Sequence, residues 1–162
     1  MIVRNWRESD LAVLHAINEA AVPGVGTLTR QALDRLVRDV SAATLVAEID
    51  GRPVGFVLCM LEGLDYGSLN YKWISERYAR FAYVDRVAVA EDQRGKRLGE
   101  ALYEAVFTRF AGERDVLLAE VNLAPPNPGS LRFHKRQNFK ECGERWEVEG
   151  KKGVVYLVRA MQ

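Results

Sequence analysis

The chain has 162 residues, of which 48% are hydrophobic and 28% are charged, and its formal net charge is +1 at pH 7. This length predicts one domain with a sizeable core, and the composition is ordinary for a soluble protein. The near-zero net charge argues against a dedicated nucleic-acid-binding protein, which usually carries a marked basic excess.

The sequence pattern predicts alternating strands and helices along the whole chain. Ser9 or Asp10 can cap the first helix, Thr29 can cap the second, and Asp50-Gly51 is a strong hairpin signal. A short helix over 72–81 is an alternative reading of the irregular, aromatic-rich segment 62–80. The predicted elements are a strand at 2–6, helices from 11 to 21 and from 30 to 40 separated by a break at 22–27, strands at 44–50, 53–61 and 81–90, a helix at 98–110, a strand at 115–121, a helix at 130–137 and a final hairpin over 139–161. This order predicts a mixed α/β domain with a largely antiparallel sheet.

The sequence lacks the features of secreted, membrane-spanning and zinc-binding proteins. The charges within residues 1–10 come too early for a signal peptide, and the longest apolar run, residues 54–61, is too short to span a membrane. Cys59 and Cys142 form no C-x-x-C pair, and no His/Cys group has the spacing of zinc ligands. We therefore expect two reduced thiols, no metal site, no membrane partner and a cytoplasmic location.

Three basic residues stand at the start of the helix over 98–110, where the backbone already carries positive charge. They are Arg94, Lys96 and Arg97, on both sides of Gly95. Free N–H groups at a helix start bind phosphates readily, and a glycine lets the backbone approach a ligand closely. The loop is therefore either an anion site or a solvated basic helix start. It contains neither the P-loop pattern nor the dinucleotide pattern G-x-G-x-x-G.

This loop resembles the acetyl-CoA signature R/Q-x-x-G-x-G/A of the GNAT superfamily of N-acetyltransferases, which follows a strand and opens a helix. Arg94 matches its first position and Gly99 its last, while Arg97 replaces the usual middle glycine. We expect Arg97 to keep a helical backbone there. The resemblance implies that this loop holds the pyrophosphate of coenzyme A, through residues Arg94, Gly95, Lys96, Arg97, Leu98, Gly99 and Glu100.

A second match lies at residues 127–139, which resemble the family's later motif of an Asn followed by a helix with an aromatic-rich end. It implies that Asn127, Ser130, Phe133 and His134 contact the cofactor. Asn138 replaces the usual glycine of this motif, which is tolerable because Asn accepts positive φ more easily than most residues.

The two matches together imply a fold and a path for the cofactor. The order of elements resembles that of the family over nearly the whole chain, so we expect a GNAT-like α/β (α+β mixed) fold with a central, mostly antiparallel sheet of six to seven strands and splayed central strands. Val87, Ala88 and Val89 would then bind the pantetheine arm, with 115–121 as the splayed partner. The aromatic segment before residue 81 is also similar to a bacterial subgroup of predicted acetyltransferases.

Amide formation from a thioester needs a neutral amine, a partner for the oxygen that gains charge, and a proton for the leaving thiolate. His134 stands where the family commonly has a tyrosine that protonates the thiolate; the alternative is an exposed helix histidine. A backbone N–H near Val89 could hold the oxygen. His15, within the apolar stripe of the first helix, is interpreted as structural.

Asp85 is the first candidate for the base that removes the amine proton. Strand alternation places it on one face with Val87 and Val89, and Tyr83 on that same face is its rival. Two alternatives stay open: an ion pair of Asp85 with Arg86 or Arg80, or proton removal by ordered water.

The acceptor pocket is expected beside these residues, because irregular segments that carry aromatic side chains often line sites. We expect Tyr66 and Asn70 to face the acceptor together with Tyr83 and Asp85, and Trp73 to pack in the core. Tyr71 and Tyr78 are further candidates for this wall, and the segment 22–27 would form the other by family likeness.

These observations predict an acetyl-CoA-dependent N-acetyltransferase acting on a primary amine of a small molecule or peptide, by direct transfer in a ternary complex. A non-catalytic acyl-CoA-binding regulatory module is the alternative. A nucleic-acid partner is a third reading, on which the net charge weighs unfavourably. It would use Arg94, Lys96, Arg97, Lys135 and Arg136. The final hairpin could also pair across a homodimer.

Overall fold

The computed structural model describes residues 1–147 and 149–161. The described strands form one sheet in the order β1-β2-β3-β4-β5-β7-β6. The strands are β1 (Ile2–Asn5), β2 (Ala43–Ile49), β3 (Arg52–Leu61), β4 (Phe81–Val89), β5 (Val116–Ala124), β6 (Lys140–Glu147) and β7 (Lys152–Ala160), and the helices are α1 (Leu11–Ala20), α2 (Arg30–Arg35), α3 (Leu69–Ser75), α4 (Leu98–Phe110) and α5 (Pro128–Arg136). Every neighbouring pair of strands is antiparallel except β4 and β5. The mostly antiparallel sheet is confirmed, and the predicted order of elements is confirmed with the addition of α3 between β3 and β4.

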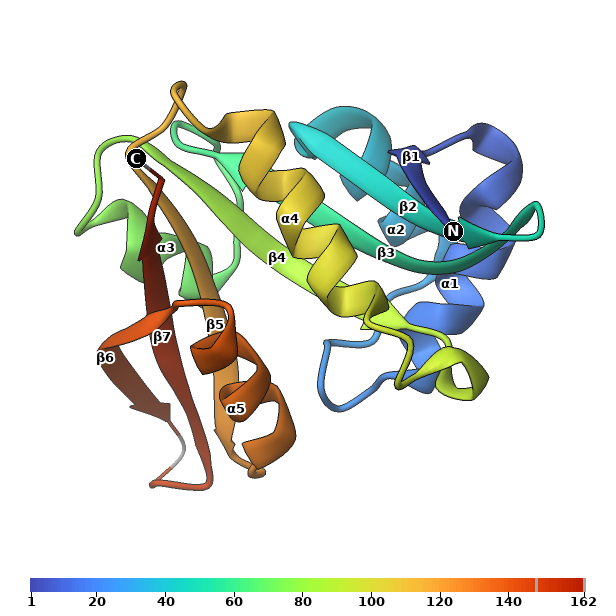
Figure 1. Ribbon diagram of the computed structural model, residues 1–162. Helices are drawn as coiled ribbons and strands as arrows, with labels where there is room; N and C mark the ends of the chain where they lie inside the picture. Colours follow the sequence, from blue (N-terminus) through green and yellow to red (C-terminus); the bar gives the residue numbers. More distant parts are fainter. Residues whose placement is uncertain (148, 162) are drawn as a thin grey trace.

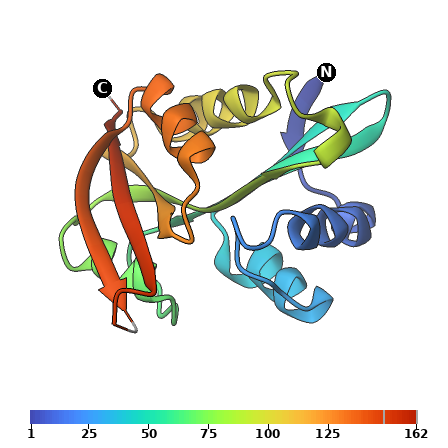
Figure 2. The same ribbon diagram turned by 90° about the horizontal axis from the view of Figure 1, so that it is seen from below.

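The sheet has helices on both faces (Figures 1 and 2). Helices α4 and α5 pack on one face, where Leu102, Tyr103 and Val106 of α4 join the core. Helices α1, α2 and α3 cover the other face, where Leu14 and Ile17 of α1 are buried. None of the helices in the described ranges is both long and apolar enough to cross a membrane.

The two central strands separate along their length. Strands β4 and β5 pair only through 81–83 and 116–118, at their N-terminal ends, and diverge beyond that point (Figure 1). The backbone of β4 after Tyr83 therefore has no strand partner on its β5 side. The expected splay of the central strands is confirmed, and it leaves polar backbone groups free for a ligand.

One expectation about β4 is wrong, because the strand contains a β-bulge. The register with β3 pairs Cys59 with Val84 and Leu58 with Arg86, so Asp85 is an extra residue. A bulge reverses the alternation of side chains that follows it.

The face assignments of β4 change accordingly. Tyr83 packs in the α1 side of the core, whereas Val87 and Val89 pack against the α4 side. Asp85 also lies on the α1 side, where its carboxylate accepts a hydrogen bond from Tyr66. Tyr83 and Asp85 thus do not share a face with the two valines, although period-two counting placed all four together.

The helix boundaries follow local capping chemistry. Thr29 caps α2 as predicted, because its hydroxyl accepts from the N–H of Ala32 at 3.0 Å. Ser68 caps α3, which therefore begins at Leu69 and ends before the tail of the predicted 72–81 segment. Asp10 does not cap α1 through its side chain; its carboxylate instead binds Arg4 and the N–H of Arg7.

Candidate active site

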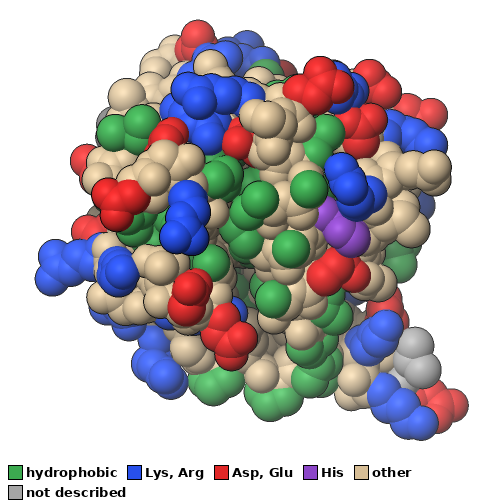
Figure 3. Space-filling view, turned by 90° about the vertical axis from the view of Figure 1, so that its right-hand side faces the viewer, with side chains coloured by type: hydrophobic (Ala, Val, Ile, Leu, Met, Phe, Trp, Pro, Cys, Tyr) green, Lys and Arg blue, Asp and Glu red, His purple; other side chains and the backbone are tan. Residues whose placement is uncertain are grey.

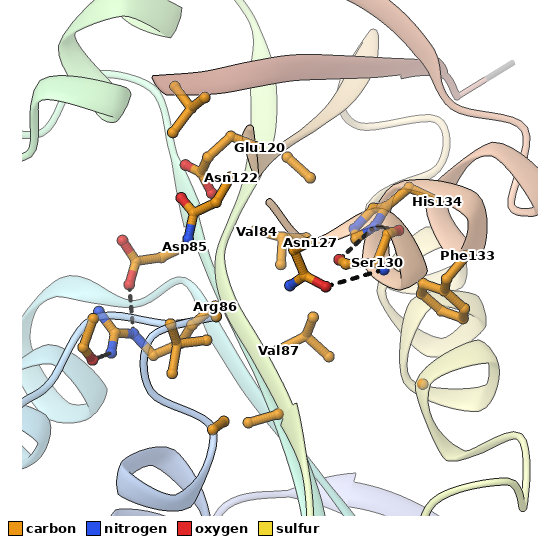
Figure 4. Close-up of a pocket in the computed structure, with 18 of the residues that line it drawn as sticks. Val84, Asp85, Arg86, Val87, Glu120, Asn122, Asn127, Ser130, Phe133 and His134 are labelled. Carbon is orange, nitrogen blue, oxygen red and sulfur yellow. Dashed lines mark hydrogen bonds and ion pairs between the residues drawn. The ribbon is translucent and has the colours of Figure 1, made fainter. Parts of the chain in front are cut away.

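A cavity of about 1060 Å³ opens where β4 and β5 diverge. The start of α4, the later part of β4 and helix α5 line one half of it, and Figure 4 shows Asn127, Ser130 and His134 of α5 on that side. The segment 21–27, the residues before α3, strand β5 and the β6–β7 hairpin line the other half. The cavity therefore connects the loop with basic residues to the aromatic segment, as the sequence interpretation requires.

The start of α4 is open to solvent, and Glu100 is the acidic residue in its first turn. Arg94, Gly95, Lys96 and Arg97 are all exposed. Within the described residues none of these cations forms an ion pair, and Lys96 bonds only the amide oxygen of Gln93. No side chain caps the helix, so the N–H groups of its first turn are available to an anion.

Arg97 does not keep a right-handed helical backbone, contrary to expectation. It occupies the left-handed region with φ 60° and ψ 28°, immediately before α4 begins. A glycine adopts this conformation without strain, whereas an arginine does so at a cost. The middle glycine of the motif is thus replaced at a position where the turn itself favours glycine. Asn138, the other substituted glycine, has φ 68° and confirms the expected tolerance of Asn.

Gly99 and Phe133 fix the contact between α4 and α5. A Cβ atom at Gly99 would lie 3.2 Å from the Phe133 ring, which is tighter than most such contacts. Asn127 begins α5, because its side-chain oxygen accepts from the N–H of Ser130 at 3.3 Å. Helices α4 and α5, which both line this half of the cavity, are therefore packed closely through two of the predicted residues.

His134 is buried, so the alternative of an exposed helix histidine is wrong. Its Nδ1 lies 2.8 Å from the carbonyl oxygen of Ser130, and its Nε2 lies 2.6 Å from the Tyr103 hydroxyl. Because a carbonyl only accepts, Nδ1 carries the proton and Nε2 accepts from Tyr103. Burial lowers the pKa of His134 below its ordinary value. The imidazole in this structure is therefore neutral and bonded at both nitrogens.

Asp85 and Arg86 form a buried ion pair at 2.8 Å, as one of the open alternatives proposed. The second carboxylate oxygen of Asp85 accepts from the Tyr66 hydroxyl at 3.0 Å. The same guanidinium donates to the side chain of Asn18 at 3.0 Å and to the carbonyl of Gly26 at 2.9 Å. The Asp85–Arg86 pair thereby joins β4 to both expected walls of the acceptor pocket: Arg86 binds Gly26 of the segment 22–27, and Asp85 binds Tyr66 of the aromatic segment.

Replacement of Arg86 by Lys tests this clamp. A single ammonium keeps the charge beside Asp85 but cannot reproduce the planar fork that bonds three partners. We expect the free energy of unfolding to fall by about 1–3 kcal/mol, as for loss of hydrogen bonds to a charged group. Denaturant unfolding measures the change. Arg52→Lys, at an exposed position, is the control; equal stability of the two variants would show that the clamp contributes nothing.

Glu120 of β5 is the residue that the sequence interpretation missed. Its carboxylate lines the cavity and accepts a hydrogen bond from the Tyr83 hydroxyl (Figure 4 shows Glu120 between Asp85 and the α5 residues). Burial, with a further contribution from the nearby Asp85 charge, raises the pKa of Glu120 to about 8. A carboxylate with a pKa near neutrality is suited to accept a proton from an amine. The signal was present in the sequence, as an acid inside a strand whose other residues, apart from Asn122, are apolar.

The aromatic segment contributes partly to the cavity. Tyr66 and Asn70 line it, as expected, and Trp73 packs by stacking on Tyr156 with 3.9 Å between ring centroids. Tyr71 is buried and donates to the carbonyl of Leu61 at 2.7 Å. Tyr78 is also absent from the lining. The pocket wall is therefore polar, with the remaining aromatic rings packed behind it.

Charges of both signs are spread over the surface. Figure 3 shows acidic and basic side chains interspersed on one face, around a hollow where hydrophobic side chains gather. Lys135, one of the basic residues considered for nucleic acid, pairs with Glu141 at 2.8 Å. This distribution does not favour a nucleic-acid interface, which needs a basic patch or stripe. Cys59 is buried and Cys142 partly buried, and both are free thiols.

Comparison with known proteins gives one consistent match. Residues 11–139 match the model of the Acetyltransferase (GNAT) family. An uncharacterised N-acetyltransferase of Methanocaldococcus jannaschii is 32% identical over 97 residues, which are 59% of this chain and 38% of that protein. The L-2,4-diaminobutyric acid acetyltransferase of Nocardia farcinica is 33% identical over 94 residues, 58% of this chain and 42% of that protein. The chain thus spans about two fifths of these relatives' length.

The fold is also shared with solved structures. The ribosomal-protein-alanine N-acetyltransferase of Brucella melitensis superposes with a TM-score of 0.73 at 23% identity, covering 99% of both chains. At this identity the likeness concerns the fold. It extends over nearly the whole length of both chains.

Proposed function

Because the chain belongs to the GNAT acetyltransferase family, we propose that it transfers the acetyl group of acetyl-CoA to the primary amine of a small molecule or peptide. The transfer is direct, with both substrates bound in one ternary complex. The observation that carries the proposal is the single cavity that joins the uncapped start of α4 to the Glu120 carboxylate. A phosphate-binding helix start and a proton acceptor are the two features that this reaction needs.

The residues around α4 fit coenzyme A. The uncapped N–H groups from Gly95 to Glu100, together with the exposed Arg94 and Arg97, suit a pyrophosphate, since anions bind favourably at a helix N-terminus. The backbone of Val87, Ala88 and Val89 pairs with β3 but not with β5, and this free side suits the amide groups of a pantetheine arm. When bound, acetyl-CoA supplies the activated acetyl group as a thioester.

Glu120 is the base in this proposal. Its ionised carboxylate takes the proton of the acceptor ammonium, and Tyr83 donates a hydrogen bond that orients it. Asp85, the base expected from sequence, has both oxygens occupied by Tyr66 and Arg86. We assign Asp85 to positioning, through its bonds to Tyr66 and Arg86. A backbone N–H near Val89 stays the expected partner of the oxygen that gains charge.

His134 stays the expected proton donor to the leaving thiolate. In this structure Nε2 carries no proton, so donation from it requires that the ring first take up a proton from solvent and that Tyr103 release its hydrogen bond. We expect His134→Ala to lower kcat by about 100-fold or more, the lower end of general-acid effects, with a smaller change in cofactor affinity. Steady-state kinetics and calorimetry measure the two quantities. Tyr103→Phe, which frees Nε2 and keeps the ring, should retain turnover.

Undiminished kcat in the His134→Ala variant would remove this residue from the acid role. Loss of kcat in both variants would instead indicate that the Tyr103–His134 pair maintains packing.

The proposed function is tested by incubating the protein with acetyl-CoA and a panel of amino acids, polyamines, aminoglycosides and peptides. Release of free thiol and acetylation of an amine, both detected by mass, are the expected result. Cofactor binding without transfer to any amine would favour the non-catalytic acyl-CoA-binding module. A protein that does not bind coenzyme A would contradict both.

A further inference from the structure

The cavity continues beyond Glu120 to a second group of charged side chains. Arg145 and Glu147 of β6 and Lys152 of β7 line this end, away from α4. No step of the proposed reaction uses them. The cavity already contains a carboxylate that can take up a proton. Cations at its other end can favour amine substrates that also carry a negatively charged group.

The strand register places Arg145 on the same face of the sheet as Glu120. Glu120 pairs with Tyr156 of β7, which pairs in turn with Gly143 of β6, and Arg145 is two residues beyond Gly143. Side chains two residues apart point to the same face. Two strand spacings separate β5 from β6, roughly 10 Å. The Arg145 guanidinium and the Glu120 carboxylate therefore face the same part of the cavity. The separation of their two strands is about the length of a small molecule.

Arg145 is held in place by neutral partners. Its Nε donates to the Tyr156 hydroxyl at 3.0 Å, and its Nη2 donates to the Asn70 side chain at 3.0 Å. The Tyr156 hydroxyl also donates to Asn70 at 2.8 Å, and Trp73 stacks on the Tyr156 ring. A guanidinium fixed in this way loses little further freedom when it binds an anion.

The remaining contact of Arg145 is replaceable. Its Nη1 donates to Glu147 at 2.6 Å, and both side chains are partly exposed, so the pair contributes little stability. Glu147 lies directly opposite Lys152 on the neighbouring strand, within reach of a cross-strand ion pair. In the described ranges Lys152 forms no ion pair. Glu147 can therefore move to Lys152 when another carboxylate binds Arg145.

From this arrangement, and resting on the proposed function, we propose that the acceptor is an amine that also carries a carboxylate or similar anion. The amine lies at Glu120 and the anion at Arg145, with Lys152 at the rim. A zwitterion matches a cavity with acidic groups at one end and cations at the other, whereas a polyamine would place a second cation beside Arg145. The anion belongs either to a free amino acid or to an acidic side chain near a peptide N-terminus.

The test compares each acceptor with its uncharged carboxamide. Substrates are ω-amino acids of two to six carbons and diamino acids with their amides, and short peptides with Asp or Asn at the second position. We expect kcat/KM for the acid to exceed that for the amide by about tenfold or more, roughly 1.4 kcal/mol per factor of ten. A preference for the acid among the amino acids indicates that the anion belongs to a free amino acid. The same preference among the peptides indicates an acidic side chain near a peptide N-terminus.

Variants test whether Arg145 carries the preference. Arg145→Gln should bring acid and amide to within about threefold, the margin by which ordinary surface changes act, and Lys152→Gln should reduce the preference without perturbing the Asn70 and Tyr156 contacts. Arg52→Gln, an exposed arginine outside the cavity, should leave the preference unchanged. An equal or greater rate with amides or polyamines in the wild type overturns the proposal, as does a preference that survives in Arg145→Gln.

Binding measurements separate this proposal from the proposed function. Calorimetry with the coenzyme A complex measures the affinity for acid and amide directly. Tighter binding of acids that depends on Arg145, in the absence of any transfer, would support the anion subsite while contradicting the proposed reaction. Transfer to amines without any preference for acids would overturn the anion subsite alone.

Discussion

Replacement of Glu120 by Gln is expected to lower kcat by about 10²–10⁴-fold, the range that general-base catalysis provides. Gln keeps the shape of the side chain and can accept the hydrogen bond from Tyr83, but it cannot take a proton from the acceptor amine. Cofactor affinity should remain unchanged, because Glu120 lies on the acceptor side of the cavity. Steady-state kinetics with saturating acetyl-CoA measure the effect.

The pH dependence of the same variant gives an independent check. Burial raises the pKa of Glu120 to about 8, so the wild-type rate should increase as pH rises through about 8, where the carboxylate ionises. A raised carboxyl pKa also means that ionisation destabilises the folded state, so wild-type stability should decline between pH 4.5 and about 8. Glu120→Gln should lack both effects and should be more stable than the wild type above pH 8.

Asp85→Asn is the matched comparison for Glu120→Gln. Asp85 is bonded to Tyr66 and Arg86, so its replacement should weaken stability and acceptor binding while the rise of rate with pH persists. If Asp85→Asn loses the pH-dependent limb and Glu120→Gln retains it, the base is Asp85 and the present assignment is wrong.

The double variant Arg94→Glu, Gly95→Glu is expected to weaken coenzyme A binding by about 100-fold or more. It reverses the charge at the start of α4, where anions are otherwise stabilised. Gly95 has φ 84°, a conformation that glutamate adopts only with strain, at a cost of order 1–3 kcal/mol. Loss of one charge-assisted hydrogen bond to phosphate adds roughly 1.5–3 kcal/mol. Isothermal titration calorimetry with coenzyme A measures the affinity.

The chain offers a closely matched control for this double variant. Gly51 has φ 76°, is exposed, and precedes the exposed Arg52 in the β2–β3 turn. The variant Gly51→Glu, Arg52→Glu makes the same chemical changes at a similar backbone conformation, away from the cavity, and should bind coenzyme A normally. Equal affinity of the two double variants would show that α4 does not hold the cofactor phosphates.

Most of the architecture was accessible from local patterns. The hairpin at Asp50-Gly51, the cap at Thr29 and the apolar stripe of α4 depend on neighbouring residues, and each is found where it was expected. The positive φ of Asn138 was likewise predictable, because Asn tolerates that conformation. The left-handed backbone of Arg97 was not predictable, because the conformation of a single loop residue depends on how the strand and the helix on either side are placed.

The site was only partly accessible from the sequence. Tyr66, Asn70 and the residues of the α4 loop line the cavity as the sequence predicted, and Glu120 was missed, while Asp85 was assigned to the wrong face of β4. The error came from the bulge in β4, which shifts side chains between faces. Whether a strand is regular is decided by its pairing with a neighbour, and periodicity within one strand does not contain that information.

The sequence by itself determined the order of elements, the strand–loop–helix that offers N–H groups to an anion, and the chemical types of residue near it. These depend on contacts a few residues apart along the chain. Tertiary structure decided which polar groups are buried together: Glu120 with Tyr83, Arg86 with Asn18, and Arg145 with Asn70. Burial and proximity set the pKa of Glu120 and the orientation of Arg145, and both arise only when strands distant in sequence lie side by side.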